Sequence, residues 1–134
     1  MNALDTALYS TLSAGTALTS QLAGTTSIYH GVAPRGSTLP YVVFNQSAGG
    51  DANDTPRRRK DLVYTVQAVS STSYKSAGLI DAAVDDLLHG QTLTVSGWTN
   101  FWTMCEQDIE YSETTDAGQI IYHVGGMYRI RLVS

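Results

Sequence analysis

A proline followed by a run of strand-forming residues, Pro40 to Phe44, constrains the fold of this chain more than any other segment. Pro40 has no N–H to donate, so it suits the first position of a strand and not its middle. The residues after it are aromatic or β-branched, and such side chains pack well on a pleated, partly buried surface. We therefore predict a strand from Pro40 to Gln46 that pairs with later strands and is covered by a helix.

Further strands are predicted before and after this segment. Asp61 to Val69 alternates regularly, which predicts a half-exposed strand. The alternation places four side chains on one face: Leu62, Tyr64, Val66 and Ala68. Phe101 to Tyr111 and Gln119 to Leu132 predict two long strands joined as an antiparallel hairpin. Shorter strands are expected at Ser27 to His30 and at Thr92 to Val95.

The N-terminal segment predicts a helix. Asn2 is a suitable N-cap, and Asp5 lies where a carboxylate favours the start of a helix. Leucines then recur at four-residue spacing, and Gly15 ends the pattern. These leucines are Leu4, Leu8 and Leu12. A second short helical segment is expected from Thr16 to Gly24.

The longest predicted helix follows Ser73, which is a suitable N-cap. Its apolar stripe consists of Ala77, Ile80, Val84, Leu87 and Leu88. Gly90 ends it, preceded by His89, whose cation would favour a helix C-terminus. Since the late strands are joined by loops of hairpin length, the predicted fold class is α+β, a mostly antiparallel β-sheet with α-helices packed on one face.

Length, charge and cysteine content narrow the function classes. At 134 residues the chain is expected to form one domain, residues 1–134. A net charge of −4 argues against a polycation that grips nucleic acid. The single cysteine, Cys105, excludes an internal disulfide framework. We expect no secretory signal and no membrane span, because the chain lacks a basic start with an apolar core and any long apolar run.

The segment from Ser47 to Lys60 is predicted to be a flexible loop without regular structure. Its glycines, proline, and Asp and Asn residues favour turns. Its composition buries little apolar surface, so we expect it to become ordered only on docking. It ends in the chain's only dense run of charge: Arg57, Arg58, Arg59 and Lys60. This run either keeps the entry to a strand solvated or presents cations to an acidic partner or a DNA backbone.

Motifs that carry chemistry are absent or incomplete. There is no Gly-x-Ser-x-Gly elbow and no phosphate-binding glycine loop. Asp51-x-Asn53-Asp54 resembles the start of a calcium loop, but the glycine at the sixth position and the closing glutamate are missing. The histidines are too far apart in sequence to indicate a shared metal site. We therefore predict no catalytic residue, no metal and no cofactor.

Two features of the C-terminal half indicate close contacts. Trp98, Phe101 and Trp102 cluster after a glycine turn, where they either complete the core or mark an interface. Gly125 and Gly126 interrupt the last strand, which predicts a β-bulge or a close approach by another backbone.

In order and spacing these elements resemble the tail-completion, or tail terminator, proteins of long-tailed bacteriophages. The similarity comprises the N-terminal leucine helix, Ile28-Tyr29 with the proline-containing loop after it, and the strand Leu39 to Phe44. It continues through the polar loop and the strand from Leu62 to the helix and the final hairpin, which ends in Tyr128-Arg129-Ile130-Arg131-Leu132.

The resemblance implies a structural virion protein and not an enzyme. Proteins of this family form a homohexameric ring on the head-proximal end of the tail tube, where the ring ends tube polymerisation and joins the tail to the head. The implied partners are further copies of the chain, the major tail tube protein and the head–tail connector or stopper. Genomic DNA would pass through the ring without specific binding, and no membrane is involved. The protein would be made in the host bacterial cytoplasm and found in the virion.

Two groups of residues follow as candidate interfaces. The first would contact the tube, the connector or the channel: Asp51, Asp54, Arg57, Arg58, Arg59 and Lys60. The second would contact a neighbouring subunit: Trp98, Trp102, Gly125 and Gly126. Three alternatives stay open, namely another neck protein such as a stopper or adaptor, a small thiol enzyme that uses Cys105 with a histidine, and a monomeric ligand-binding domain.

Overall fold

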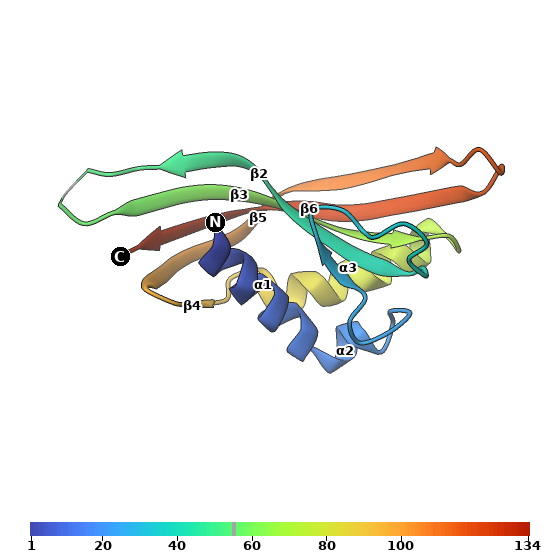
Figure 1. The fold of residues 1–134 in the computed structure, drawn as a ribbon, viewed down its shortest axis with the longest axis horizontal. Helices are drawn as coiled ribbons and strands as arrows, with labels where there is room; N and C mark the ends of the chain where they lie inside the picture. Colours follow the sequence, from blue (N-terminus) through green and yellow to red (C-terminus); the bar gives the residue numbers. More distant parts are fainter. Residues whose placement is uncertain (55) are drawn as a thin grey trace.

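A computed structural model describes residues 1–54 and 56–134 of the chain. A long sheet of six strands lies over a group of helices that cover the middle of one face (Figure 1). The strand order across the sheet is β1-β2-β3-β6-β5-β4. In chain order the elements are α1 (Asn2–Ala14), α2 (Thr16–Thr19), β1 (Ile28–His30), β2 (Tyr41–Asp51), β3 (Arg59–Ser70), α3 (Tyr74–Leu88), β4 (Thr94–Val95), β5 (Trp98–Thr114) and β6 (Ile120–Val133).

The sheet is mixed, with one parallel pair at its edge. β1 runs parallel to β2, with Ile28 opposite Val42. The pairs β2–β3, β3–β6, β6–β5 and β5–β4 are antiparallel. The prediction of an α+β fold with a mostly antiparallel sheet and helices on one face is confirmed.

The core lies between the helices and the covered face of the sheet. Its main side chains come from β3 (Leu62, Tyr64, Val66, Ala68), β6 (Tyr128, Ile130, Leu132), α1 (Leu4, Leu8, Leu12) and α3 (Ala77, Ile80, Val84, Leu88). The predicted alternation of β3 and the predicted stripes of both helices are therefore confirmed. Burial of one large aliphatic side chain contributes roughly 1.5–3 kcal/mol, so this layer is what stabilises the middle of the molecule.

The predicted boundaries of α3 are also confirmed. The Ser73 hydroxyl accepts a hydrogen bond from the N–H of Ser76 at 3.1 Å, as an N-cap does. Gly90, just past the helix, has a φ of +71°. Leu87 packs against Gly15, where an added Cβ would lie 2.5 Å from Leu87 Cδ1. The glycine that ends α1 therefore also lets α3 approach closely.

The start of α1 differs from the prediction. The N-cap is Met1 and not Asn2, and no side chain caps this end. Asp5 instead accepts a hydrogen bond from the Tyr64 hydroxyl at 2.6 Å, and the N-terminal ammonium lies 3.5 Å from its other oxygen. The carboxylate thus joins α1 to β3. The second helix begins at Thr16 as predicted but ends at Thr19, well before Gly24.

The hairpin between β2 and β3 is more regular than predicted. β2 continues to Asp51 and β3 begins at Arg59, so the expectation of no regular structure from Ser47 to Lys60 is wrong at both ends of that segment. Thr55 lies outside the described residues. Whether the tip is flexible in solution stays a prediction.

Two local features let the glycine-rich part of β2 pair with β3. A register shift between Gln46 and Ala48 marks a β-bulge. Gly49 has a φ of +98°, and the backbone of Asp61 and Leu62 leaves no room for a Cβ there. Gly49, which favoured a loop in the sequence, therefore allows the close pairing of β2 with β3.

Gly125 and Gly126 lie in β6, between β3 and β5, and both are buried. A Cβ on Gly125 would collide with the backbone of Val66 in β3, and one on Gly126 would lie 2.8 Å from Cys105 Sγ. The predicted close approach is therefore made by neighbouring strands of the same chain. The bulge lies in the facing strand, where the register of β5 shifts between Cys105 and Gln107.

Candidate interaction surfaces

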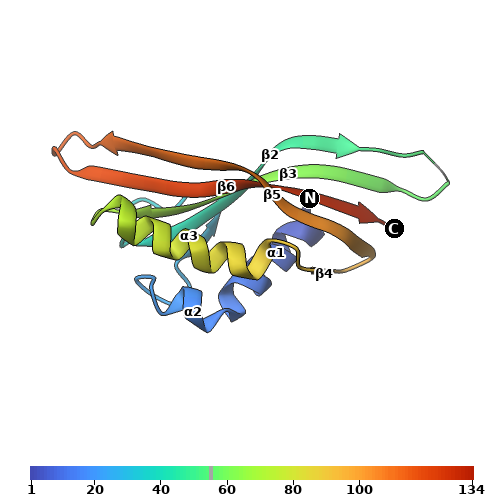
Figure 2. The same ribbon diagram turned by 180° about the vertical axis from the view of Figure 1, so that it is seen from behind.

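Two hairpins extend beyond the helix-covered middle in opposite directions (Figures 1 and 2). The β2–β3 hairpin ends on one side of the molecule, and the β5–β6 hairpin ends on the other. We define the basic end as residues 51–54 and 56–60 together with Phe101, Trp102 and Arg131. We define the acidic arm as residues 108–120, which form the outer part of the β5–β6 hairpin.

The predicted anchor cations lie at the basic end, where acidic residues of the same hairpin pair with them. Lys60 Nζ donates a hydrogen bond to Asp51 at 2.7 Å, which lowers the pKa of Asp51. Arg58 lies 3.8 Å from the other oxygen of Asp51, and Arg59 lies 3.4 Å from Asp54. Asp51 and Asp54, predicted as interface residues, therefore act as counter-ions within the tip.

The backbone of the basic end is held in place while its outer cations face solvent. The N–H of Ser134 donates to the carbonyl of Arg58 at 2.9 Å, and the N–H of Arg58 donates to the Ser134 hydroxyl at 3.2 Å. The Arg58 side chain is nevertheless 69% exposed, and Arg57 is exposed as well. A backbone held at Arg58 beside exposed guanidinium groups is suited to binding an acidic surface.

The aromatic cluster divides between core and surface. Trp98 is partly buried and packs against the core. Phe101 and Trp102 are 48% and 40% exposed. The Arg59 guanidinium lies 5.7 Å from the centre of the Phe101 ring, and that of Arg131 lies 5.3 Å from the Trp102 ring. The basic end therefore presents exposed aromatic rings together with cations, at distances typical of cation–π contacts.

A buried asparagine shapes this surface, and sequence reasoning missed it. A register shift between Asn100 and Trp102 leaves Phe101 as the extra residue of a β-bulge. Asn100 accepts a hydrogen bond from the N–H of Leu93 at 2.8 Å and donates to the carbonyl of Arg131 at 3.1 Å. Because asparagine is depleted in strands, the predicted strand begins only at Phe101, and the sequence carries little signal for a role of Asn100.

The basic end also contains a hollow of about 230 Å³. Its lining residues are Ala52, Asp54, Arg59, Lys60, Asp61, Phe101 and Arg131. Three of these seven are cations, two are carboxylates and one is an exposed aromatic ring, so the net charge of the lining is positive. The hollow is therefore suited to a side chain that carries a carboxylate beside an apolar group.

The acidic arm has the opposite charge. No Lys or Arg occurs between residues 76 and 128. The carboxylates of the arm are Asp108, Glu110, Glu113 and Asp116. At its base, His123 Nε2 lies 2.8 Å from Glu113, and the rings of His123 and Tyr111 stack with their centres 4.4 Å apart. The base is ordered by these contacts, while residues 110–120 are all exposed.

A charged network crosses the face of the sheet opposite the helices. Arg129 donates to Asp61 at 2.7 Å and to Glu106 at 2.8 Å, and Arg131 lies 3.4 Å from Asp61. These hydrogen bonds raise the pKa of Arg129. Sequence reasoning missed the network because its members come from three strands whose register was unknown.

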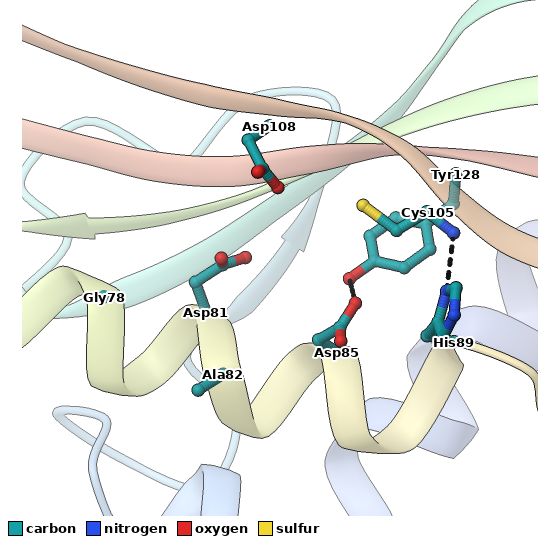
Figure 3. A pocket seen from close by; sticks show the side chains of 8 residues that line it. All are labelled: Gly78, Asp81, Ala82, Asp85, His89, Cys105, Asp108 and Tyr128. Carbon is teal, nitrogen blue, oxygen red and sulfur yellow. Dashed lines mark hydrogen bonds between the residues drawn. The ribbon is translucent and has the colours of Figure 1, made fainter.

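An acidic cleft of about 330 Å³ lies between α3 and β5 (Figure 3). Its lining includes Asp81, Asp85, Cys105, Asp108 and Tyr128. Burial and the charges of Asp85 and Asp108 raise the pKa of Asp81 to about 6. The Tyr128 hydroxyl donates to Asp85 at 2.9 Å. Among the described residues, no group of three or more potential ligands is arranged to hold a metal ion.

The cleft brings Cys105 close to a histidine, as the thiol-enzyme alternative requires, but the hydrogen bond between them is made by the backbone of Cys105. The backbone N–H of Cys105 donates to His89 Nδ1 at 3.0 Å, so this contact does not involve the thiol. Burial and nearby Asp85 and Asp108 raise the pKa of the thiol. A nucleophilic cysteine needs a lowered pKa, so this environment disfavours catalysis by Cys105.

Protruding charged hairpins, together with a cysteine whose environment disfavours catalysis, favour a class of protein that acts through contacts with other molecules. Comparisons with known proteins specify this class. The family model described as "Tail completion protein gp17" matches residues 6–123, and the chain belongs to this family. The resemblance to tail-completion proteins predicted from the sequence is confirmed.

A similar solved structure comes from a gene transfer agent particle. Its title is "Virion of native gene transfer agent (GTA) particle"; the TM-score is 0.82 at 20% identity, covering 99% of this chain and 96% of that chain. At this identity the likeness establishes the fold. No curated protein matches the chain significantly. The described residues contain no helix long and apolar enough to cross a membrane. Family membership makes the protein a structural component of the tail or neck of a phage-like virion.

Proposed function

We propose that the protein closes the head-proximal end of a phage tail tube as a ring, ends tube polymerisation and joins the tail to the head connector. The observation that carries this proposal is the match of the tail completion family over residues 6–123. The shared fold with a component of a gene transfer agent virion supports it.

The placement of the two charged surfaces also favours a ring. A closed ring of identical subunits needs two different surfaces on each copy, because each contact is head-to-tail. The basic end and the acidic arm lie at opposite ends of the molecule (Figure 1). We propose a homohexamer, with the tail tube protein on one side, the connector or stopper on the other, and DNA passing through without specific binding.

The deciding experiment is electron microscopy of a lysate from a phage that lacks this gene. We expect separate filled heads beside tails of irregular, often excessive length, because nothing would end tube growth. A plasmid-borne copy of the gene should restore joined particles of normal length.

Two other outcomes would change the assignment. Tails of normal length beside unjoined heads would favour the alternative of a stopper or adaptor on the connector side. Intact, infectious particles would refute a role in tail completion.

A further inference from the structure

We infer that the acidic arm of one copy binds the basic end of the next copy, and that this contact holds the assembly together. The inference rests on the proposed ring only for the number of copies that close. The occupant of each surface is a second copy of this chain.

Charge is the first reason. Six of the eight Lys and Arg residues lie in the β2–β3 hairpin and the C-terminal half of β6: Arg57, Arg58, Arg59, Lys60, Arg129 and Arg131. Eight of the twelve Asp and Glu residues lie between residues 81 and 116: Asp81, Asp85, Asp86, Glu106, Asp108, Glu110, Glu113 and Asp116. The two surfaces lie too far apart in one copy to meet (Figure 2). Every copy, however, carries both surfaces, so the acidic arm of one copy can meet the basic end of another.

The apolar side chains match as well. The basic end exposes Phe101 and Trp102, and the acidic arm exposes Tyr111 and Ile120 by 43% and 46%. Aromatic and Arg side chains are the residues that most often dominate binding energy at protein interfaces. Burial of exposed apolar groups on both surfaces would add a hydrophobic contribution to the binding free energy, which electrostatic steering alone does not supply.

Local shape favours the same pairing. The hollow at the basic end is lined by three cations (Arg59, Lys60 and Arg131), two carboxylates (Asp54 and Asp61) and the Phe101 ring. Its net positive charge beside an aromatic ring suits a carboxylate next to an apolar group. Ile109, Tyr111 and Glu113 alternate along β5 and share one face of it, which places apolar groups next to a carboxylate on the arm. In the described part of the chain, β4 pairs with β5 only at Trp98 and Thr99, so the outer edge of β5 carries no partner strand along the arm. The arm can therefore lie against another molecule.

A second copy of the chain is complementary to both charged surfaces, whereas another partner would be complementary to only one of them. A DNA backbone would be attracted to the basic end but repelled by the acidic arm. A tube or connector protein could bind either surface, but only the chain itself carries both complements.

The test exchanges charges in two variants. The arm variant carries Glu110→Lys, Glu113→Lys and Asp116→Lys, and the tip variant carries Arg57→Glu and Arg58→Glu. A control variant, Arg35→Glu with Lys75→Glu, reverses two cations outside both surfaces. Sedimentation at low salt measures association of each protein, and circular dichroism with urea unfolding verifies that each is folded.

We expect the wild type and the control variant to associate, and each exchanged variant alone to sediment as a monomer. An equimolar mixture of the arm and tip variants should associate again, because every contact in an alternating assembly then joins opposite charges. Association of the wild type should weaken as salt shortens the Debye length from about 10 Å at 0.1 M to about 3 Å at 1 M.

Three results would overturn the inference: a monomeric wild type at low salt, association of either variant alone, or a mixture that stays monomeric. The proposed function is judged separately, by joining of tails to heads. Variants that associate normally but fail to join tails would place the cations on the tube or connector, so the inference would fail and the function stand. Wild-type rings that obey the charge rules but never join tails would support the inference and refute the proposed function.

Discussion

The two hairpins are built alike, yet they differ in where their counter-charges lie. In the basic end, Asp51 and Asp54 pair with Lys60, Arg58 and Arg59 of the same hairpin. The acidic arm has no Lys or Arg of its own, and its closest basic group is His123 at the base. The basic end therefore keeps its shape largely through its own ion pairs, whereas the charge of the acidic arm is left for a partner to neutralise.

Both hairpins extend from the same helix-covered middle of the molecule, which we call the body. β3 and β6 lie side by side in the middle of the sheet, where their apolar residues alternate into the core. Beyond the helices the residues of both hairpins are mostly exposed. Burial of apolar side chains therefore determines the structure of the body, whereas backbone geometry and charge determine the structure of the two hairpins.

The largest expected effect on stability comes from a difference in backbone geometry between the two hairpins. Gly49 in the basic hairpin has a φ of +98° and no room for a Cβ, whereas Gly118 in the turn of the acidic arm has a φ of +81° but open space around it. Gly49→Ala should lower the free energy of unfolding by about 3 kcal/mol, from backbone strain and overpacking together. Gly118→Ala should cost only about 1 kcal/mol, from strain alone. Urea unfolding measures both.

Gly50→Ala is the matched control for this pair. Gly50 lies next to Gly49 but has neither a positive φ nor any atom within 4 Å of an added Cβ. Its replacement should change stability by no more than ~0.5 kcal/mol. Equal losses for Gly49→Ala and Gly50→Ala would show that the close approach to β3 does not constrain the basic hairpin.

A smaller effect concerns the acidic side of the molecule. Burial and the neighbouring carboxylates raise the pKa of Asp81 from 3.8 to about 6. The folded state therefore binds the proton more tightly than the unfolded chain, and stability falls as pH rises from about 4 to about 6. Asp81→Asn should raise the free energy of unfolding at pH 7 by roughly 1 kcal/mol, allowing for solvent screening, and should have no effect near pH ~3.

Urea unfolding of the wild type and Asp81→Asn across this pH range measures the difference. Asp86→Asn, an exposed change on the same helix, is the control and should leave the pH profile as it is. A loss of stability in Asp81→Asn at pH 7 would mean that the carboxylate is favourably placed, and that the cleft is not strained by like charge.

The sequence predicted the body of the protein well and its extensions poorly, for a physical reason. Alternation in β3 and the leucine spacing of α1 follow directly from burial, which the order of residues encodes. The strand at Gly49 was predicted as loop, because its pairing depends on a register that only the fold supplies. Asn100 was missed for the same reason, since its partners include backbone groups of β6 and of the segment before β4. The cations of the basic end were found from their density, but their counter-ions and aromatic neighbours could not be placed.

The smallest expected effect concerns Asp51 at the basic end. Its charged form stabilises the folded state, whereas that of Asp81 destabilises it. The hydrogen bond from Lys60 lowers the pKa of Asp51 below its usual 3.8, so its contribution to stability is present above that pH and is lost as pH falls through the lower, folded value. Asp51→Asn should lower the urea midpoint slightly at neutral pH, and the loss should disappear in acid. Combining it with Lys60→Met isolates the pair, because the second change should cost less once the first is made. A loss that persists in acid, or that is unchanged by salt, would mean that Asp51 supports the hairpin by packing or hydrogen bonding and not by charge. The basic end would then not be the internally paired counterpart of the acidic arm.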